Sequence, residues 1–104
     1  MAGYDIIRQA ILDKTNIRAT YHGFVRELSP HVMGLKEDRQ QVLSYQFGGD
    51  SESGLEPIGS VRNWRCMEIA DMVDVSPMGG EWETVPVHTR PQVCVDTVDV
   101  AVTY

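Results

Sequence analysis

The chain lacks long hydrophobic runs, which excludes a membrane-spanning helix. It also has few basic residues, which argues against non-specific binding to polyanions. Among its 104 residues, no apolar stretch approaches the roughly 20 residues that a membrane-spanning helix needs. Residues 1–5 are too polar to begin a signal peptide, so we expect a cytoplasmic protein with no membrane contact. Nine lysines and arginines stand against 15 acids, which gives a net charge of -6. Because non-specific affinity for polyanions comes mainly from cations, the composition argues against such binding.

The sequence also lacks the spacings of catalytic and metal sites. Cys66 and Cys94 lie far apart, and in a cytoplasmic chain we expect reduced, partly buried thiols rather than a disulfide. The cysteines and histidines show neither Cys-x-x-Cys nor His-x-x-x-His spacing. Nothing in the sequence places a base near a cysteine nucleophile, and residues 50–54 lack the lysine and helix of a P-loop, which favours a solvated loop. We therefore expect no enzyme, no metal and no cofactor.

The charge that is present is unevenly placed. Residues 1–49 hold six basic and five acidic residues, whereas residues 50–104 hold three basic and ten acidic ones. Any anion site must therefore be local and built from a few arginines. The length suits one domain with one core.

The apolar pattern predicts one short helix followed by strands. Residues 3–14 form the helix, with Ile7, Ala10 and Ile11 on one stripe. Strands are expected at 17–22, 24–28, 41–47, 64–69 and 72–75. Pro30 should interrupt the second strand at an edge or kink, after which 31–35 continues extended. A long loop covers 48–62.

The end of the chain leaves two structural alternatives. In the tail, residues 81–104, valines alternate toward the C-terminus. This run is either a sixth strand or an arm that pairs with a neighbouring chain. The whole pattern predicts a mainly β fold: a small SH3- or Sm-like barrel of five or six strands over residues 16–75, with one N-terminal helix.

A candidate site lies on the paired strands. Arg26 shares a strand face with Leu28, which is unusual for a strand that only builds a core. The run from Arg26 to His31, the pair Tyr45-Gln46, and the run from Trp64 to Met72 resemble in order and spacing the WYL domain family. The resemblance covers roughly residues 5–75. The trio that names the family appears here as residues 41–43, Gln-Val-Leu, and Asp71 stands where the family usually has arginine.

The resemblance implies a stand-alone, bacterial WYL-like domain that senses a ligand in transcription regulation or phage defence. Its groove would bind a nucleotide or single-stranded nucleic acid. Arg26 and Arg65 would hold an anionic group, Tyr45 would stack on a ring, and His31 and Gln46 would supply hydrogen bonds.

Two alternatives remain open at this point. The arginines could instead pair on the surface with acids such as Glu27, Glu68 or Asp71, and His31 could be a hydrogen-bonded turn residue. The whole domain could also be a protein-interaction or homo-oligomerisation module without a small ligand, whose C-terminal strand pairs with a partner or a second copy.

Overall fold

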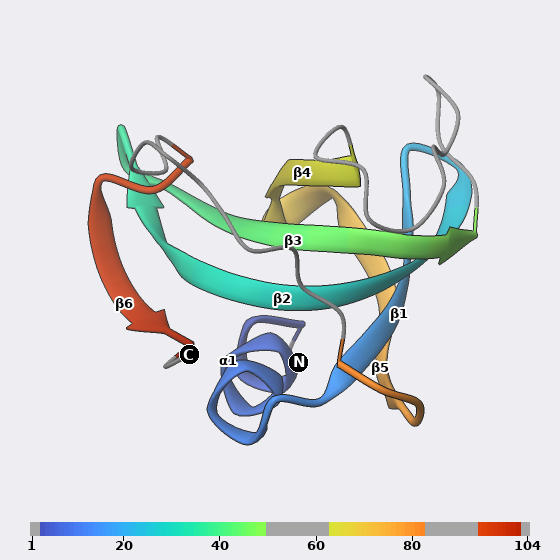
Figure 1. Cartoon of the computed structure of the whole chain (residues 1–104). Helices are drawn as coiled ribbons and strands as arrows, with labels where there is room; N and C mark the ends of the chain where they lie inside the picture. The colour runs from blue at the N-terminus through green and yellow to red at the C-terminus, as the bar shows by residue number, and fades with distance from the viewer. Residues whose placement is uncertain (1–2, 50–62, 83–93, 103–104) are drawn as a thin grey trace.

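One helix and six strands make up the chain in the computed structural model, which describes residues 3–49, 63–82 and 94–102 (Figure 1). The expected long loop begins too early, because β3 continues through Gly48 and Gly49; its remaining residues, 50–62, and much of the tail lie outside the described ranges. The elements are α1 (Gly3–Asp13), β1 (Asn16–Tyr21), β2 (Phe24–Lys36), β3 (Arg39–Gly49), β4 (Trp64–Glu68), a 3-10 turn (Ile69–Asp71), β5 (Met72–Met78) and β6 (Thr97–Ala101). The prediction of a mainly β fold with one N-terminal helix is confirmed.

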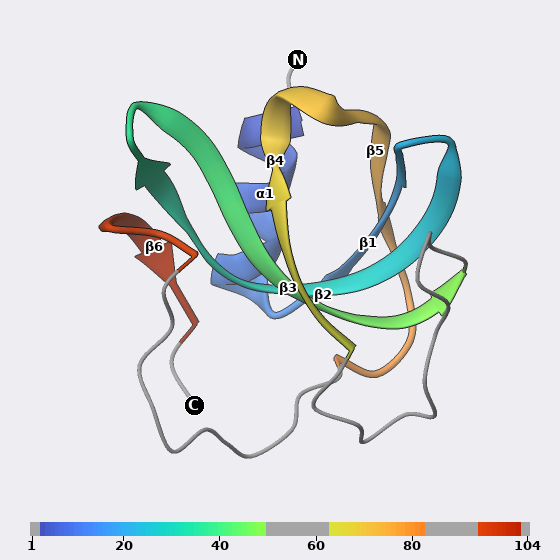
Figure 2. The same cartoon turned by 90° about the horizontal axis from the view of Figure 1, so that it is seen from above.

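The six strands form one antiparallel sheet in the order β4-β3-β2-β1-β5, with β6 paired to β2 off this path. Figure 2 shows that β2 and β3 bend strongly along their length. The 3-10 turn connects the two outermost strands, β4 and β5. In the described ranges no ladder pairs these two strands with each other, so the sheet is not closed by hydrogen bonding.

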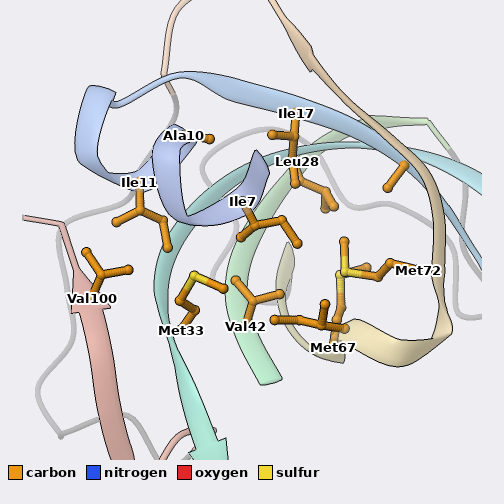
Figure 3. Close-up of a cluster of buried hydrophobic side chains, with 12 residues drawn as sticks. Ile7, Ala10, Ile11, Ile17, Leu28, Met33, Val42, Met67, Met72 and Val100 are labelled. Carbon is orange, nitrogen blue, oxygen red and sulfur yellow. The ribbon is translucent and has the colours of Figure 1, made fainter. Parts of the chain in front are cut away.

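The core lies between α1 and the sheet (Figures 1 and 3). The predicted helix stripe is buried as expected, because residues spaced three and four apart share one face of a helix. It packs on side chains from every strand; the cluster comprises Ile7, Ala10, Ile11, Ile17, Ala19, Leu28, Met33, Val42, Met67, Ile69, Met72 and Val100.

Pro30 does not end its strand, contrary to the expected interruption. β2 runs unbroken from Phe24 to Lys36, with a register shift opposite β3 between Pro30 and Val32. On the other edge of β2, the pairing with β1 ends at Leu28 and the pairing with β6 begins at Val32. The proline, which has no N–H to donate, therefore falls between two partner strands.

The valine-rich run forms a sixth strand of the same chain. β6 pairs with the C-terminal half of β2, in the register Met33↔Val100 and Gly34↔Val98. Within the described residues this strand therefore belongs to the sheet of its own chain.

The expectation of two reduced cysteines is wrong. Cys66 on β4 and Cys94 just before β6 form a disulfide, with their Cα atoms 5.6 Å apart. The amide oxygen of Gln41 lies 3.0 Å from Cys66 Sγ and 3.8 Å from Cys94 Sγ. The segment that leads into β6 therefore crosses the sheet toward β4, which a separation of 28 residues in the sequence does not reveal.

Two glycines with the same backbone conformation make a matched test of this fold. Gly23 and Gly49 have φ of 83° and 82°. A Cβ at Gly23 would meet no atom within 4 Å, whereas one at Gly49 would lie 2.2 Å from the carbonyl oxygen of Val25. Gly23→Ala should lower the free energy of unfolding by about 1 kcal/mol, because alanine disfavours the left-handed conformation. Gly49→Ala should cost roughly 2–4 kcal/mol, because backbone atoms must also move.

Urea unfolding of the two variants and the wild type measures this difference. Equal losses of unfolding free energy in both variants would contradict the close approach of β3 to β2 at Gly49.

Candidate functional site

The five residues expected to bind ligand fall into two groups on opposite faces of the sheet. Arg26, Gln46 and Arg65 lie on the face that carries the core, since Arg26 and Leu28 follow each other on one side of β2 and Gln46 pairs with Leu28. Tyr45 is the next residue along β3 and points to the other face. His31 lies on the same face as Tyr45, because the rings of both residues contact the Trp64 ring. The structure does not bring all five into one groove.

We call Arg26, Gln46 and Arg65 the arginine group. Gln46 is fully buried. Its side-chain oxygen accepts a hydrogen bond from Arg65 Nε at 3.1 Å, and its side-chain nitrogen donates to the Gly48 carbonyl at 3.0 Å. Because both ends of the amide are bound, Gln46 fixes the orientation of the half-buried Arg65 guanidinium.

Arg26 is more deeply enclosed, with 3% of its surface exposed. Its guanidinium donates to the Tyr21 carbonyl at 3.2 Å and lies 5.0 Å from the Tyr21 ring and 5.8 Å from the Phe24 ring. A cation over an aromatic face in such a sheltered place is stabilised by the ring quadrupole. Arg26 therefore supports the β1–β2 hairpin as well as adding positive charge.

The acids proposed as surface partners of these arginines also lie close to other side chains. Glu27 forms an ion pair with Arg18 at 3.4 Å and Glu68 forms one with Arg39 at 3.9 Å. The Asp71 carboxylate lies 3.6 Å from Nε2 of His22, a contact that is an ion pair only when the histidine is protonated. Such exposed pairs contribute little to stability.

The second group, here called the aromatic group, consists of His31, Tyr45, Trp64 and Trp82. The His31 ring lies 4.6 Å from that of Trp64 and 4.2 Å from that of Trp82, and Trp64 lies 5.2 Å from Tyr45. His31 and Tyr45 are both fully buried. A nucleobase could stack on Tyr45 only after Trp64 had moved.

Residues 79–82 cover the aromatic group from outside the sheet. The side-chain nitrogen of the buried Asn16 donates to the Glu81 carbonyl at 2.8 Å and to the Gly79 carbonyl at 3.4 Å. Its oxygen accepts from the Ser29 hydroxyl at 2.6 Å. Asn16 thus ties β1, β2 and the chain after β5 together and holds Trp82 over His31.

His31 is a neutral, buried histidine at the register shift of β2. Its Nδ1 lies 2.7 Å from the Ser29 carbonyl, to which it donates. Burial lowers the pKa of His31 to about 4, against the opposing effect of the hydrogen bond to Ser29. His31 is thus hydrogen-bonded, as the alternative to ligand binding expected, but it lies within β2 and not in a turn.

Sequence reasoning missed Trp82, Asn16 and Ser29, whose roles depend on where the chain after β5 returns. Trp64, which the resemblance places only at the start of a strand, is half-buried on the face opposite the core. No local pattern marks these four residues as neighbours.

Within the part of the chain that the structure describes, no three His, Cys, Asp or Glu side chains gather in a way that could hold a metal ion. No described helix is long and apolar enough to cross a membrane. No family model, curated protein or solved structure matches this chain.

Because His31 is buried, we expect the free energy of unfolding to decrease as the pH is lowered. Unfolding exposes the imidazole and restores its pKa to about 6.5, so the unfolded chain takes up a proton that the folded chain refuses. The stability is complete above pH 6.5 and is lost as the pH falls toward 4, by at most about 3 kcal/mol. His31→Phe should flatten this slope.

The measurement is urea unfolding at several pH values between 4 and 7. His22→Asn is the control, because His22 is exposed and has a positive φ that asparagine tolerates. If the wild type and the His31 variant have the same pH slope, burial of His31 as a neutral ring is refuted.

Proposed function

We propose that this chain is a WYL-like, ligand-sensing regulatory module that binds the anionic group of a nucleotide or short single-stranded nucleic acid. Arg65 and Arg26 provide the positive charge, and Gln46 positions Arg65. The proposed setting is bacterial transcription regulation or phage defence, and no catalysis is assigned to the chain.

The observation that carries the proposal is the Arg65–Gln46–Gly48 arrangement on the core face. A guanidinium that is already oriented loses less entropy when it binds a carboxylate or phosphate end-on. The placement of Arg26 on the same face adds a second positive charge in a chain of net charge -6. That net charge favours a single anionic group over the long backbone of a polyanion.

The order of the strands supports an SH3- or Sm-like barrel. The helix precedes the sheet, and a single 3-10 turn links the outermost strands β4 and β5. The Tyr21 hydroxyl on β1 accepts a hydrogen bond from the Glu68 amide at the end of β4, at 3.2 Å. This bond links the two sides of the bent sheet, which supports the proposal, although no strand ladder closes the sheet in the described residues.

Because the aromatic group is buried, fewer residues are proposed to contact the ligand than the WYL resemblance implies. His31 and Tyr45, which the WYL resemblance assigns to the ligand, lie on the opposite face from Arg65 and are fully buried. In the proposed function they support the sheet behind the site. A cytoplasmic location is also part of the proposal, and in that compartment a disulfide acts in regulation more often than in stability.

Arginine substitutions test the proposal directly. The purified protein is titrated with a panel of nucleotides and short single-stranded RNA and DNA, at low and moderate salt. Arg65→Ala should weaken binding at least about tenfold, the value of one charge-assisted contact. Arg65→Lys should recover only part of it, because lysine lacks the planar fork.

Arg18→Ala is the matched control, since Arg18 is exposed on the opposite face and pairs with Glu27. It should bind like the wild type, and circular dichroism should show that all variants are folded. Absence of binding by the wild type at low salt, where charges are screened least, would refute the proposal. So would an equal loss in the Arg18 and Arg65 variants.

A further inference from the structure

The C-terminal strand β6 is held to the rest of the molecule by a nearby disulfide, by a backbone ladder and by a small number of side-chain contacts. The disulfide attaches Cys94 to Cys66 on β4, and β6 begins three residues later at Thr97. Of the five residues of β6, only Val100 is buried. Figure 3 shows Val100 beside Ile11 and Met33 at the edge of the core.

The polar contacts of β6 are exposed and weak. The Asp99 carboxylate accepts a hydrogen bond from the Tyr4 hydroxyl and forms an ion pair with Arg8 at 3.3 Å. An exposed pair of this kind is screened by solvent. β6 is also held by the backbone ladder to Val32–Leu35 of β2 and by the bonds that flank it, from Asp96 N to Leu35 O and from Val102 N to His31 O. On either side of the strand, Val95 is buried and Val102 packs against the core.

The disulfide is therefore the strongest single restraint on this segment. In the chain-entropy treatment, a link between cysteines 28 residues apart restricts the unfolded chain and so favours the folded chain by about 400-fold. Cys66 is exposed, so a reductant can reach the bond, whereas Cys94 is buried against the sheet. Reduction removes the restraint without changing any residue.

Release of β6 would leave an open strand edge. The Val32–Leu35 edge of β2 has β3 on one side and β6 alone on the other. Unpaired edges of this kind bind extended segments readily. The fit is close at Gly34, where a Cβ would lie 2.0 Å from the Thr97 carbonyl oxygen. The edge is thus shaped for the backbone of residues 97–101.

We propose that the Cys66–Cys94 disulfide is a redox latch on β6, and that its reduction allows two copies of this chain to exchange their C-terminal strands. A dithiol supplies two electrons and two protons, the S–S bond breaks to give two thiols, and the dithiol becomes a disulfide. Each released β6 then pairs with the Val32–Leu35 edge of the other copy.

A second copy fits this edge because it reproduces every contact that the chain now makes with itself. An identical molecule offers the same register on β2, the same packing site for Val100 and the same partners for Asp99. Exchange of an identical element is a low-cost route to a dimer. Twelve residue steps separate Trp82 from Cys94, which allows a reach of up to roughly 40 Å.

A mixing experiment tests the exchange. Cys66→Ser and Cys94→Ser variants are mixed under reduction and then oxidised with oxidised glutathione, which accepts the two electrons. Exchange places Cys94 of one variant beside Cys66 of the other, so a disulfide-linked dimer should appear on a non-reducing gel of the mixture. Each variant alone should give at least about tenfold less, because its exchanged dimer has no pair of cysteines at the junction.

Wild-type protein gives a second readout that does not depend on the variants folding. Light scattering should show a monomer when oxidised and a concentration-dependent dimer when reduced. A reduced wild type that stays monomeric at its highest soluble concentration would overturn the proposal. Equal amounts of linked dimer in each variant alone and in the mixture would also overturn it. Neither result bears on ligand binding by Arg65, so the two proposals fail independently.

Discussion

The strand β2 must satisfy hydrogen bonds on both edges over 13 residues, and the rest of the structure follows from how it does so. β3 serves one edge along nearly the whole length, while β1 and β6 share the other. Between those two partners lie Pro30, which has no N–H to donate, and His31, whose carbonyl accepts a hydrogen bond from the Val102 amide. A buried backbone group without a partner would be costly, so the return of the C-terminal chain to β2 is a requirement of this fold.

Local periodicity predicted much of the fold. The helix stripe of Ile7, Ala10 and Ile11 and the mainly β pattern depend only on spacings along the chain, and both are confirmed. The unbroken course of β2 through Pro30 could not be read locally, because it depends on which strand lies opposite each edge. The disulfide could not be read either, since the default of reduced cysteines came from an assumed compartment and not from the position of residue 94 in space.

The candidate site was partly readable from the sequence. Gln46 and Arg65 lie on neighbouring strands, and their contact follows from strand register once β3 and β4 are paired. Simple alternation also places Tyr45 and Gln46 on opposite faces, so the separation into two groups was implicit in the sequence. The role of Trp82 could not be predicted from the sequence. Trp82 is held over His31 because the Asn16 side chain donates to a backbone carbonyl of the neighbouring chain, a contact that no spacing predicts.

Hydrogen exchange of backbone amides tests most directly the claim that β6 closes β2 and that the disulfide keeps it closed. Oxidised and reduced wild-type protein are compared at a concentration low enough for both to be monomeric, because strand exchange in a dimer would protect the same amides. The account predicts slow exchange at residues 97–102 when oxidised, and exchange at least about tenfold faster there after reduction, with the β1–β2 hairpin unchanged. If residues 97–102 are equally protected in both states, the strand is held by its own contacts and the account is contradicted.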